Sequence, residues 1–470
     1  MSILKIIVIA LEVLLLFNLL IFVHELGHFL AARWRGLKID RFAIWFGKPI
    51  WKKKIGGVEY ALGTIPAGGY VSLPQMATME AIEGKGESSG QLASLPNISP
   101  LDKIIVAFAG PLFSFLLALA FALVVMIVGR PVSEAERTTT IGYVVKAGPA
   151  DEAGLRPGDR ILSVDARPVT KFGGMGASVT WRIVRSEGAI VPITVEREGK
   201  VLEFFPKPSK EPTKPWERKS LRKIQIAPAH DLVVGDLAPN SPASLARLRA
   251  GDQILSVNGL KLYHCNALDD YAENHPDETL RLSCLRQGQP LEISVKPEVP
   301  ATGGKASLGI LTWEDKWTLR YPGAIEQVKA SVTTMFETFG ALFAPHSDIK
   351  PQHLGGAVKI MEVYSRLFNA EQGWRLALWF SVLMNVNLAV LNMLPIPVLD
   401  GGHILLAVIE GVRRKPISAR LLGAVQTTCA VLLIAFMLYI AFYDVQDLPW
   451  NRAKDKPADI RFSPKSSEKE

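Results

Sequence analysis

The sequence contains few histidines and few cysteines for its length. Among 470 residues there are 8 His and 3 Cys. Membrane hydroxylases that hold metal ions in histidine clusters would need many more histidines in the membrane loops, so the sequence argues against that class. Three cysteines allow at most one disulfide within the chain. Cys429 lies in an apolar run, whereas Cys265 and Cys284 lie in a more polar region, where they could pair if their strands were adjacent or remain free thiols.

Charged residues are scarce in four long stretches of the chain. Hydrophobic residues make up 49% of the sequence, and the mean hydropathy is +0.20. A run of about 20 apolar residues is long enough to cross a bilayer, which predicts spans at about 4–32, 104–128, 376–409 and 421–443. The first run is too long for a signal peptide and lacks a convincing small-x-small cleavage site. We therefore expect a polytopic α-helical membrane protein with about four transmembrane helices.

Positive charge is concentrated in two loops. Part of the net charge of +8 comes from the segment after the first span, which contains eight basic residues and only one acid, Asp40. The eight are Arg33, Arg35, Lys38, Arg41, Lys48, Lys52, Lys53 and Lys54, and the loop between the third and fourth spans adds Arg413, Arg414, Lys415 and Arg420. Basic loops favour the cytoplasmic side of a membrane. Both termini and the segment 130–375 are then expected on the other side, and this asymmetry explains the basic composition without a nucleic-acid partner.

The first span contains an HExxH motif, His24-Glu25-Leu26-Gly27-His28. On a helix, residues i and i+4 share a face, so both imidazoles can bind one metal ion while Glu25 lies beside them to transfer a proton. Ionisable side chains at membrane depth are costly when unpaired and are therefore functional candidates. The apolar flanks favour a metal site over a chance match.

A catalytic zinc ion needs a third protein ligand and an open fourth position. The strongest candidate is Asp400, which is the only carboxylate between Glu371 and Glu410. It follows two prolines and precedes two glycines, so we expect a broken helix, which is tolerated at membrane depth where it lines a cavity. His403 is the alternative third ligand, although it lies beyond the two glycines, near the expected cytoplasmic end.

A segment of the polar region is repeated. Residues 142–166 align without gaps to residues 235–259, with 12 identities in 25 positions, which indicates a duplicated domain. Each copy contains a short Ala/Leu helix, a Gly-Asp pair, the strand ILSV and a turn. The pattern resembles the PDZ domain and implies a groove that binds an extended peptide by strand addition. The alternative is that both domains are spacers or steric filters without a specific peptide ligand.

HExxH in a first span, Leu-Asp-Gly in a later span and PDZ-like domains between them resemble the site-2 protease family of intramembrane metalloproteases. The resemblance runs nearly end to end. It implies one Zn²⁺ per chain, held by His24, His28 and Asp400, with Glu25 as the general base and later the acid. It also implies that Asn387 and Asn392 make substrate or supporting hydrogen bonds, whereas polar residues in membrane helices also commonly join helices.

Two shorter segments bear on the same resemblance. Residues 64–71 contain Gly68, Gly69 and Tyr70 and are similar to a family element that forms a membrane-dipping β-hairpin, which could bind an unwound substrate through its edge. The alternative is a simple loop with a Gly-Gly turn. Ser114 occupies a position in the second span where the family often has asparagine, a departure that affects details of helix packing.

The resemblance implies a protein of the bacterial inner membrane. Its expected substrates are single-pass membrane proteins already cut outside the membrane, such as an anti-sigma factor, or signal-peptide remnants. A non-catalytic PDZ scaffold is the alternative, but it leaves the buried ionisable residues without a purpose. The expected organisation is 1–130 (spans one and two), 131–225 and 226–300 (two extracytoplasmic PDZ-like α+β domains), 301–375 (amphipathic helices at the membrane surface), 376–445 (spans three and four) and 446–470 (a polar tail).

Overall fold

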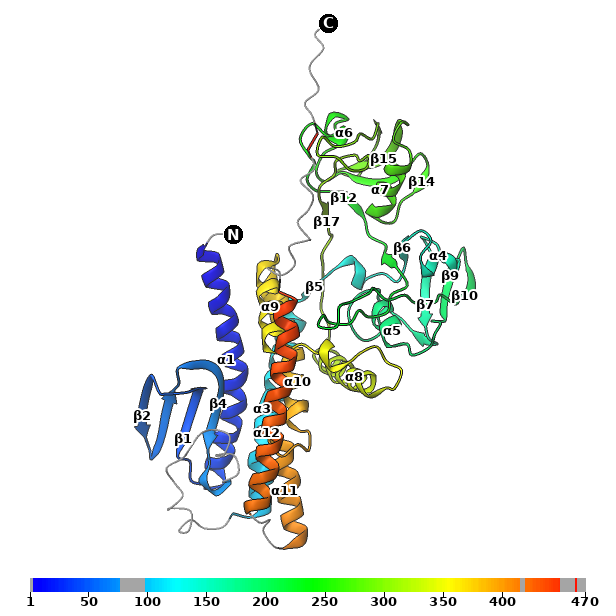
Figure 1. Cartoon of the computed structure of the whole chain (residues 1–470). Coiled ribbons are helices and arrows are strands. Elements are labelled where there is room, and N and C mark those ends of the chain that lie inside the picture. The colour runs from blue at the N-terminus through cyan, green and yellow to red at the C-terminus, as the bar shows by residue number, and fades with distance from the viewer. Residues whose placement is uncertain (1–2, 77–97, 415–418, 449–460, 463–470) are drawn as a thin grey trace. The chain divides into compact units, whose positions relative to one another are not determined.

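The computed structural model describes residues 3–76, 98–414, 419–448 and 461–462 (Figure 1). The chain divides into two compact units. The first contains residues 1–130, 320–336 and 354–448, and the second contains residues 131–319, 337–353 and 449–470. The polar tail expected over 446–470 lies mostly outside the described residues.

The first unit is built around long helices. Within the described residues, four helices are long and apolar enough to cross a membrane, which agrees with the expected number of spans. They are α1 (Ile3–Trp34), α3 (Pro100–Val128), α10 (Gly373–Asn392) and α12 (Ala419–Gln446). The other helices are α8 (Ala324–Phe343), which continues into the second unit, α9 (Ala357–Asn369) and α11 (Asp400–Arg413).

Helix α3 is the centre of this unit because it packs against α1, α10 and α11. Its N-terminus is fixed by a capping box, in which the Ser99 hydroxyl accepts from the Asp102 amide and the Asp102 carboxylate accepts from the Ser99 amide. This arrangement satisfies two backbone donors that would otherwise lack partners. Pro100 occupies the first turn, where a missing N–H costs nothing. Small residues such as Ala118 and Ala122 are fully buried and let the neighbouring helices approach closely.

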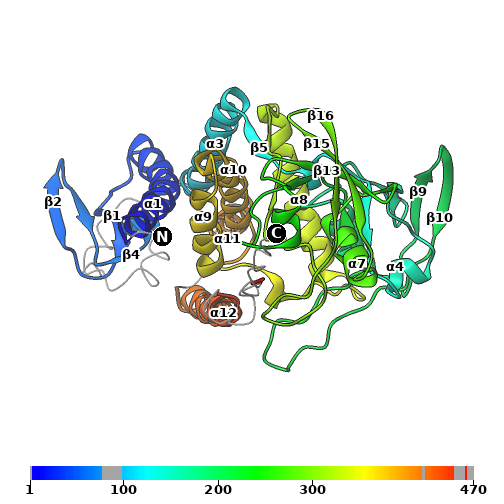
Figure 2. The ribbon, with the colours of Figure 1, turned by 90° about the horizontal axis from the view of Figure 1, so that it is seen from above.

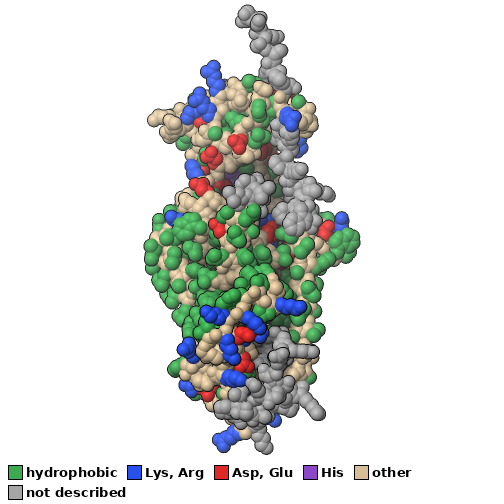
Figure 3. Space-filling model, turned by 90° about the vertical axis from the view of Figure 1, so that its left-hand side faces the viewer, with side chains coloured by type: hydrophobic (Ala, Val, Ile, Leu, Met, Phe, Trp, Pro, Cys, Tyr) green, Lys and Arg blue, Asp and Glu red, His purple; other side chains and the backbone are tan. Residues whose placement is uncertain are grey.

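The outer surface of these helices is apolar. Exposed side chains on α1 include Ile7, Leu11 and Leu15, and α12 exposes a further apolar series. Figure 3 shows hydrophobic side chains covering this part of the surface, with Lys and Arg gathered apart from it. Such a surface is expected of helices that face lipid.

A four-stranded sheet follows α1 in the chain. Its strands are β1 (Arg41–Phe46), β2 (Trp51–Ile55), β3 (Val58–Leu62) and β4 (Ile65–Ser72), in the order β2-β3-β1-β4. The sheet lies on one side of α1, and α3, α9, α10 and α11 lie on the other (Figures 1 and 2). The expected β-hairpin is therefore part of a larger sheet, and Gly68 and Gly69 lie inside strand β4 rather than at a turn. The parallel pairing of β1 with β3 joins strands that are not consecutive, which a local turn signal does not reveal.

Helix α9 packs more extensively than an isolated surface helix would. It contacts α1, α10 and α12. Its Tyr364 is fully buried, and the tyrosine hydroxyl shares a hydrogen bond of 2.9 Å with the hydroxyl of Ser381 in α10. The position of α8 and α9 at a membrane surface stays a prediction.

The second unit contains two α/β halves with the same element order. The first half contains β6 (Ile141–Val144), α4 (Pro149–Glu152), β7 (Arg160–Val164), β8 (Arg167–Pro168), α5 (Val179–Arg185), β9 (Ile193–Arg197), β10 (Lys200–Phe204) and β11 (Ile226–Pro228). The second half contains β12 (Leu232–Val234), α6 (Pro242–Leu245), β13 (Gln253–Val257), β14 (Leu260–Lys261), α7 (Cys265–Asn274), β15 (Leu280–Arg286), β16 (Gln289–Val295) and β17 (Trp313–Glu314). The pairs α4/α6, β7/β13 and β8/β14 are separated by the 93-residue offset of the sequence repeat. Each half has its own apolar core.

The aspartate of the repeated Gly-Asp pair makes the same contacts in both halves. Asp252 accepts two hydrogen bonds of 2.7 Å from the Arg286 guanidinium and one of 2.8 Å from the Arg249 amide. Asp159 does the same with Arg197 and the Arg156 amide. Burial alone would raise the pKa of Asp252, but these hydrogen bonds lower it below its usual value. The repeated aspartate thus forms the same buried ion pair in both halves, with an arginine from outside the repeated segment. The PDZ assignment itself stays a prediction.

The cysteines are free thiols in this structure. Cys284 lies in β15 and is 2% exposed, and burial raises the pKa of its thiol to about 12. Cys265 is the first residue of α7 and is only partly buried. The sequence allowed Cys265 and Cys284 either to pair or to remain free, and in the structure they are free.

Candidate metal centre

The HExxH motif lies on the second half of α1, where both histidines are buried. The exposed fractions are 7% for His24 and 4% for His28. Their side chains project from the same face of the helix, as the four-residue spacing requires. The Nε2 atoms of the two rings are 3.3 Å apart.

Asp400 joins these histidines from the first residue of α11. Its carboxylate oxygens lie 3.3 Å from Nε2 of His24 and 3.4 Å from Nε2 of His28. The expected break is present, because α10 ends at Asn392 and α11 begins at Asp400. At both Gly401 and Gly402 a Cβ atom would come closer than 3.0 Å to backbone atoms of the segment between the helices. The two glycines therefore let α11 begin directly against that segment, and this packing places Asp400 beside the histidines.

Helix α3 orients both imidazoles through hydrogen bonds to their Nδ1 atoms. Nδ1 of His28 lies 2.8 Å from the carbonyl oxygen of Val106, and Nδ1 of His24 lies 3.0 Å from the hydroxyl of Ser114. The carbonyl can only accept, so His28 donates from Nδ1 and keeps the lone pair on Nε2, toward the centre. Hydrogen bonds of this kind orient most metal-binding histidines. Ser114 is fully buried and is a site residue that the sequence reasoning assigned only to helix packing.

The donor set of this cluster fits a zinc ion. Oδ2 of Asp400 is buried and has no hydrogen-bond partner among the described residues. The Nε2 atoms of His24 and His28 and the carboxylate oxygens of Asp400 therefore lie 3.3–3.4 Å from one another. Most of these atoms are hydrogen-bond acceptors, so they cannot all satisfy one another. A divalent cation would satisfy all three, and three N and O ligands with an open fourth position are typical of catalytic zinc. The three residues form one of two candidate metal-binding groups in the described part of the chain.

Glu25 lies on a different face of α1, toward the sheet. A Cβ atom on Gly69 would lie 3.2 Å from Cγ of Glu25 and 3.2 Å from a side-chain carbon of Ile21. Glycine at position 69 therefore lets strand β4 approach the helix next to Glu25. Strand β4 pairs with β1, and no other described strand pairs with it. The expected substrate-binding element and the expected general base thus lie side by side.

Gly68 and Tyr70 flank this contact in β4. A Cβ atom on Gly68 would collide with the ring of Phe46, and the same ring stacks on Tyr70 with 6.1 Å between the ring centroids. The Tyr70 hydroxyl also accepts a hydrogen bond from the Arg41 guanidinium. These contacts fix the strand on its β1 side.

The two expected asparagines differ in their surroundings. The side-chain amide nitrogen of Asn392, at the end of α10, lies 3.3 Å from Nε2 of His24. Oδ1 of Asn387 is buried and has no hydrogen-bond partner among the described residues. Asn392 therefore contacts one of the proposed zinc ligands, whereas the side-chain oxygen of Asn387 is a buried acceptor that a substrate could satisfy.

His403, the alternative third ligand, is not part of the cluster. It is 8% exposed and lines a separate pocket together with Lys103, Glu410 and Met76. The atoms that meet His24 and His28 are those of Asp400. The geometry favours Asp400.

Comparison with known proteins covers nearly the whole chain. A family model described as peptidase family M50 matches residues 12–436, a range that includes the HExxH motif and Asp400. Regulator of sigma-E protease RseP of Escherichia coli strain K12 is 30% identical over 455 residues, which cover 92% of this chain and 97% of that protein. Protease RseP of Yersinia pestis is 28% identical over 449 residues, with 92% and 97% covered. A relative from Neisseria meningitidis, described in its name as a zinc metalloprotease, is 26% identical over 445 residues, with 91% and 96% covered.

Proposed function

The chain belongs to peptidase family M50, and we propose that it is a zinc endopeptidase that cleaves single-pass membrane proteins within or beside the bilayer. The family is the one expected from the two metal motifs, and membership makes the chain a metalloprotease. The observation that carries the finer proposal is the convergence of His24, His28 and Asp400, next to or on helices apolar enough to span a membrane.

We assign the roles of the site residues from their geometry. His24, His28 and Asp400 would hold one catalytic zinc, and Ser114 and the Val106 carbonyl would keep the imidazoles oriented. When bound, zinc would supply a Lewis acid that polarises the attacking water and the scissile carbonyl. Glu25 would accept the proton of that water and then donate it to the leaving nitrogen.

Strand β4 supports a route by which a membrane-embedded substrate could reach these residues. A substrate helix has its backbone hydrogen bonds satisfied internally and must unwind before a peptide bond can be attacked. The free edge of β4 could satisfy the unwound segment by strand addition. Because Gly69 places β4 beside Glu25, a substrate strand there would lie near the general base. Asn387 and Asn392 would supply further hydrogen bonds to the substrate backbone.

The relatives and the charge pattern support a proposal for the substrate class and the membrane orientation. The name of the Escherichia coli relative, regulator of sigma-E protease, supports an anti-sigma factor as one kind of substrate, and we propose signal-peptide remnants as another. The relatives and the candidate spans support a bacterial inner-membrane protein, and the basic loops support an orientation with both termini and the PDZ-like halves outside the cytoplasm. We propose that these two halves restrict the access of substrates with intact ectodomains.

Replacement of the general base tests the catalytic proposal. Glu25→Gln should abolish cleavage of a single-pass substrate in reconstituted vesicles while zinc content stays unchanged, because the amide cannot accept the proton and Glu25 is not a ligand. The matched control is Glu12→Gln, which makes the same change at an exposed site on the same helix and should keep both zinc and activity. Cleavage by Glu25→Gln near the rate of the unmodified protein would refute the assigned role.

A further inference from the structure

A second cluster of metal-binding side chains lies in the second unit, outside the proposed proteolytic site. It consists of His230, His264 and Cys265, whose candidate ligand atoms all lie within 4.8 Å of one another. All three residues are partly buried. None of them has a role in the proteolytic proposal.

The fold brings these residues together from two segments. His230 lies on the connection between β11 of the first half and β12 of the second half. His264 is the N-cap of α7, and Cys265 is its first residue. The connection and the helix meet where the amide of Cys265 points at Nε2 of His230, with 3.4 Å between the two nitrogens. The cluster therefore lies at the junction of the two halves.

The hydrogen bonds of His230 orient it as a ligand. Its Nδ1 lies 3.0 Å from the carbonyl oxygen of Asp231, which can only accept, so Nδ1 carries the proton. Nε2 then holds the lone pair, and this nitrogen faces Cys265. A backbone carbonyl that accepts from the opposite ring nitrogen is a common arrangement behind metal-binding histidines.

His264 and Cys265 present a second nitrogen and a sulfur to the same space. Nδ1 of His264 accepts the Asn266 amide at 3.1 Å, so this nitrogen also carries a lone pair. Sγ of Cys265 lies 3.7 Å from it. The rings of His230 and His264 meet edge to face, with 4.6 Å between their centroids. A cation among these atoms would replace the Asn266 amide as the partner of Nδ1 of His264, and the Cys265 amide as the partner of Nε2 of His230.

The donor types select the class of cation. Thiolate and imidazole ligands suit zinc and other borderline or soft transition metals, whereas calcium and magnesium require oxygen ligands. We propose that His230, His264 and Cys265 form a second metal site, which binds Zn²⁺ or a chemically similar cation. Binding converts the Cys265 thiol to a thiolate that bonds the metal, and the displaced proton passes to solvent.

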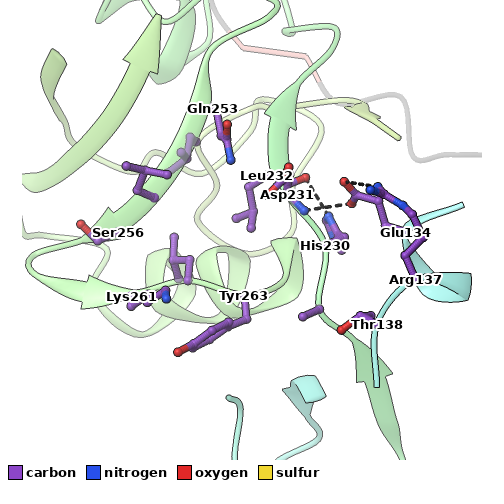
Figure 4. Close-up of a pocket in the computed structure, with 14 residues that line it drawn as sticks. Glu134, Arg137, Thr138, His230, Asp231, Leu232, Gln253, Ser256, Lys261 and Tyr263 are labelled. Atoms are coloured by element: carbon purple, nitrogen blue, oxygen red, sulfur yellow. Dashed lines mark hydrogen bonds and ion pairs between the residues drawn. The ribbon is translucent and has the colours of Figure 1, made fainter. Parts of the chain in front are cut away.

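The site borders a pocket on its His230 side and contacts the first half of the unit on its His264 side. His230 lines a pocket whose wall also contains Glu134, Asp231 and Tyr263 (Figure 4). The ring of Tyr143, in β6 of the first half, stacks on His264 with 5.8 Å between centroids, and its hydroxyl donates to Asp270 in α7. A metal ion that holds His264 to His230 would therefore restrain the junction between the two halves.

Cobalt substitution in the full-length protein tests this site separately from the catalytic cluster. Thiolate bound to Co²⁺ gives a charge-transfer absorption in the near ultraviolet, and the cluster of His24, His28 and Asp400 contains no sulfur. We expect this absorption on titration of the unmodified protein with Co²⁺. Cys265→Ser should abolish it, and His230→Ala should weaken Co²⁺ binding by more than about 10-fold, the lower limit for losing an outer-shell partner.

Matched variants keep the test specific. Cys429→Ser removes a thiol elsewhere, and His275→Ala removes a partly buried histidine at the other end of α7. Both should keep the absorption. Zn²⁺ should also slow alkylation of Cys265 in the unmodified protein, a measurement that needs no variant. Absence of the absorption, its survival in Cys265→Ser, or alkylation unaffected by Zn²⁺ would each overturn the proposal.

The outcome is independent of the proteolytic proposal. His24→Ala should lose the catalytic zinc but keep the cobalt–thiolate absorption. If the absorption disappears in His24→Ala while it survives in Cys265→Ser, the sulfur assignment is wrong. If cleavage is intact while the absorption is absent, the second site fails and the protease stands.

Discussion

Replacement of Ser114 by alanine isolates the part of the metal centre that the sequence did not reveal. The hydroxyl of Ser114 lies 3.0 Å from Nδ1 of His24 and is fully buried in α3. Alanine removes this oxygen without adding volume. The Nδ1 atom of His24 then loses its partner inside a buried helix interface, where leaving a polar group unsatisfied is costly. We expect the ring to reorient and its Nε2 atom to bind zinc less well.

The expected size of the effect follows from the kind of contact that is lost. Loss of a partner behind a metal-binding histidine typically lowers metal affinity by 10–100-fold, which corresponds to about 1.4–2.7 kcal/mol. The zinc dissociation constant, measured by competition with a chelator in detergent, should rise by that factor. Ser114→Asn should recover most of the affinity, because its amide can also form a hydrogen bond with Nδ1 of His24.

Ser381→Ala is the matched control for this prediction. Ser381 is also fully buried in a membrane helix, but its hydroxyl bonds with Tyr364 rather than with a ligand. This variant should lower stability without changing zinc affinity. Equal zinc affinity in Ser114→Ala and the unmodified protein would refute the orienting role, and equal losses in both alanine variants would point to a general loss of packing.

Three further predictions concern the ligands, the space around them and the second unit. Asp400→Ala should lose most of the catalytic zinc whereas His403→Ala should keep it, as metal analysis would show; full zinc occupancy in Asp400→Ala would move the third ligand elsewhere. Gly110→Ala should lower zinc affinity at least as much as Ser114→Ala, because its Cβ would come closer than 3.0 Å to Nε2 of His28; unchanged affinity would show that the ring can move freely. Deletion of 140–300 should relax the preference for pre-trimmed over full-length substrate without ending cleavage, and an unchanged preference would refute the filter.

Two parts of the metal centre could be predicted from the sequence because each of them is local, whereas the contact between Asp400 and the two histidines is not. A single helix fixes the relation of His24 to His28, and the Pro and Gly residues around Asp400 mark a helix break at membrane depth. Long, strongly apolar segments likewise predict their own spans, which is why the number of candidate helices agrees with expectation. The third expected span, 376–409, is divided between α10 and α11, and only α10 is long enough to be a candidate. In these cases neighbouring residues determine the outcome.

The remaining features depend on contacts between distant segments. Ser114 lies 90 residues from His24, and Val106 contributes only a backbone carbonyl, which no residue type signals. Strand β4 occupies its sheet edge because β1 pairs with both β3 and β4, a choice that a Gly-Gly pair does not encode. His230 meets His264 and Cys265 through the packing of the β11–β12 connection against α7, so their spacing along the chain resembles no metal motif.

Two glycines allow distant segments to contact the residues proposed to carry out the chemistry. Gly110 lies against the ring of His28 from α3, and Gly69 lies against Glu25 from β4. Each glycine thus removes the one carbon atom that would separate a neighbouring element from the HExxH helix. Helix α1 can therefore be packed closely on its ligand face by α3 and on its Glu25 face by the strand proposed to bind substrate. A protease that must exclude lipid from its metal and still admit an unwound peptide needs both approaches, and residues with a Cβ at either position would open one of them.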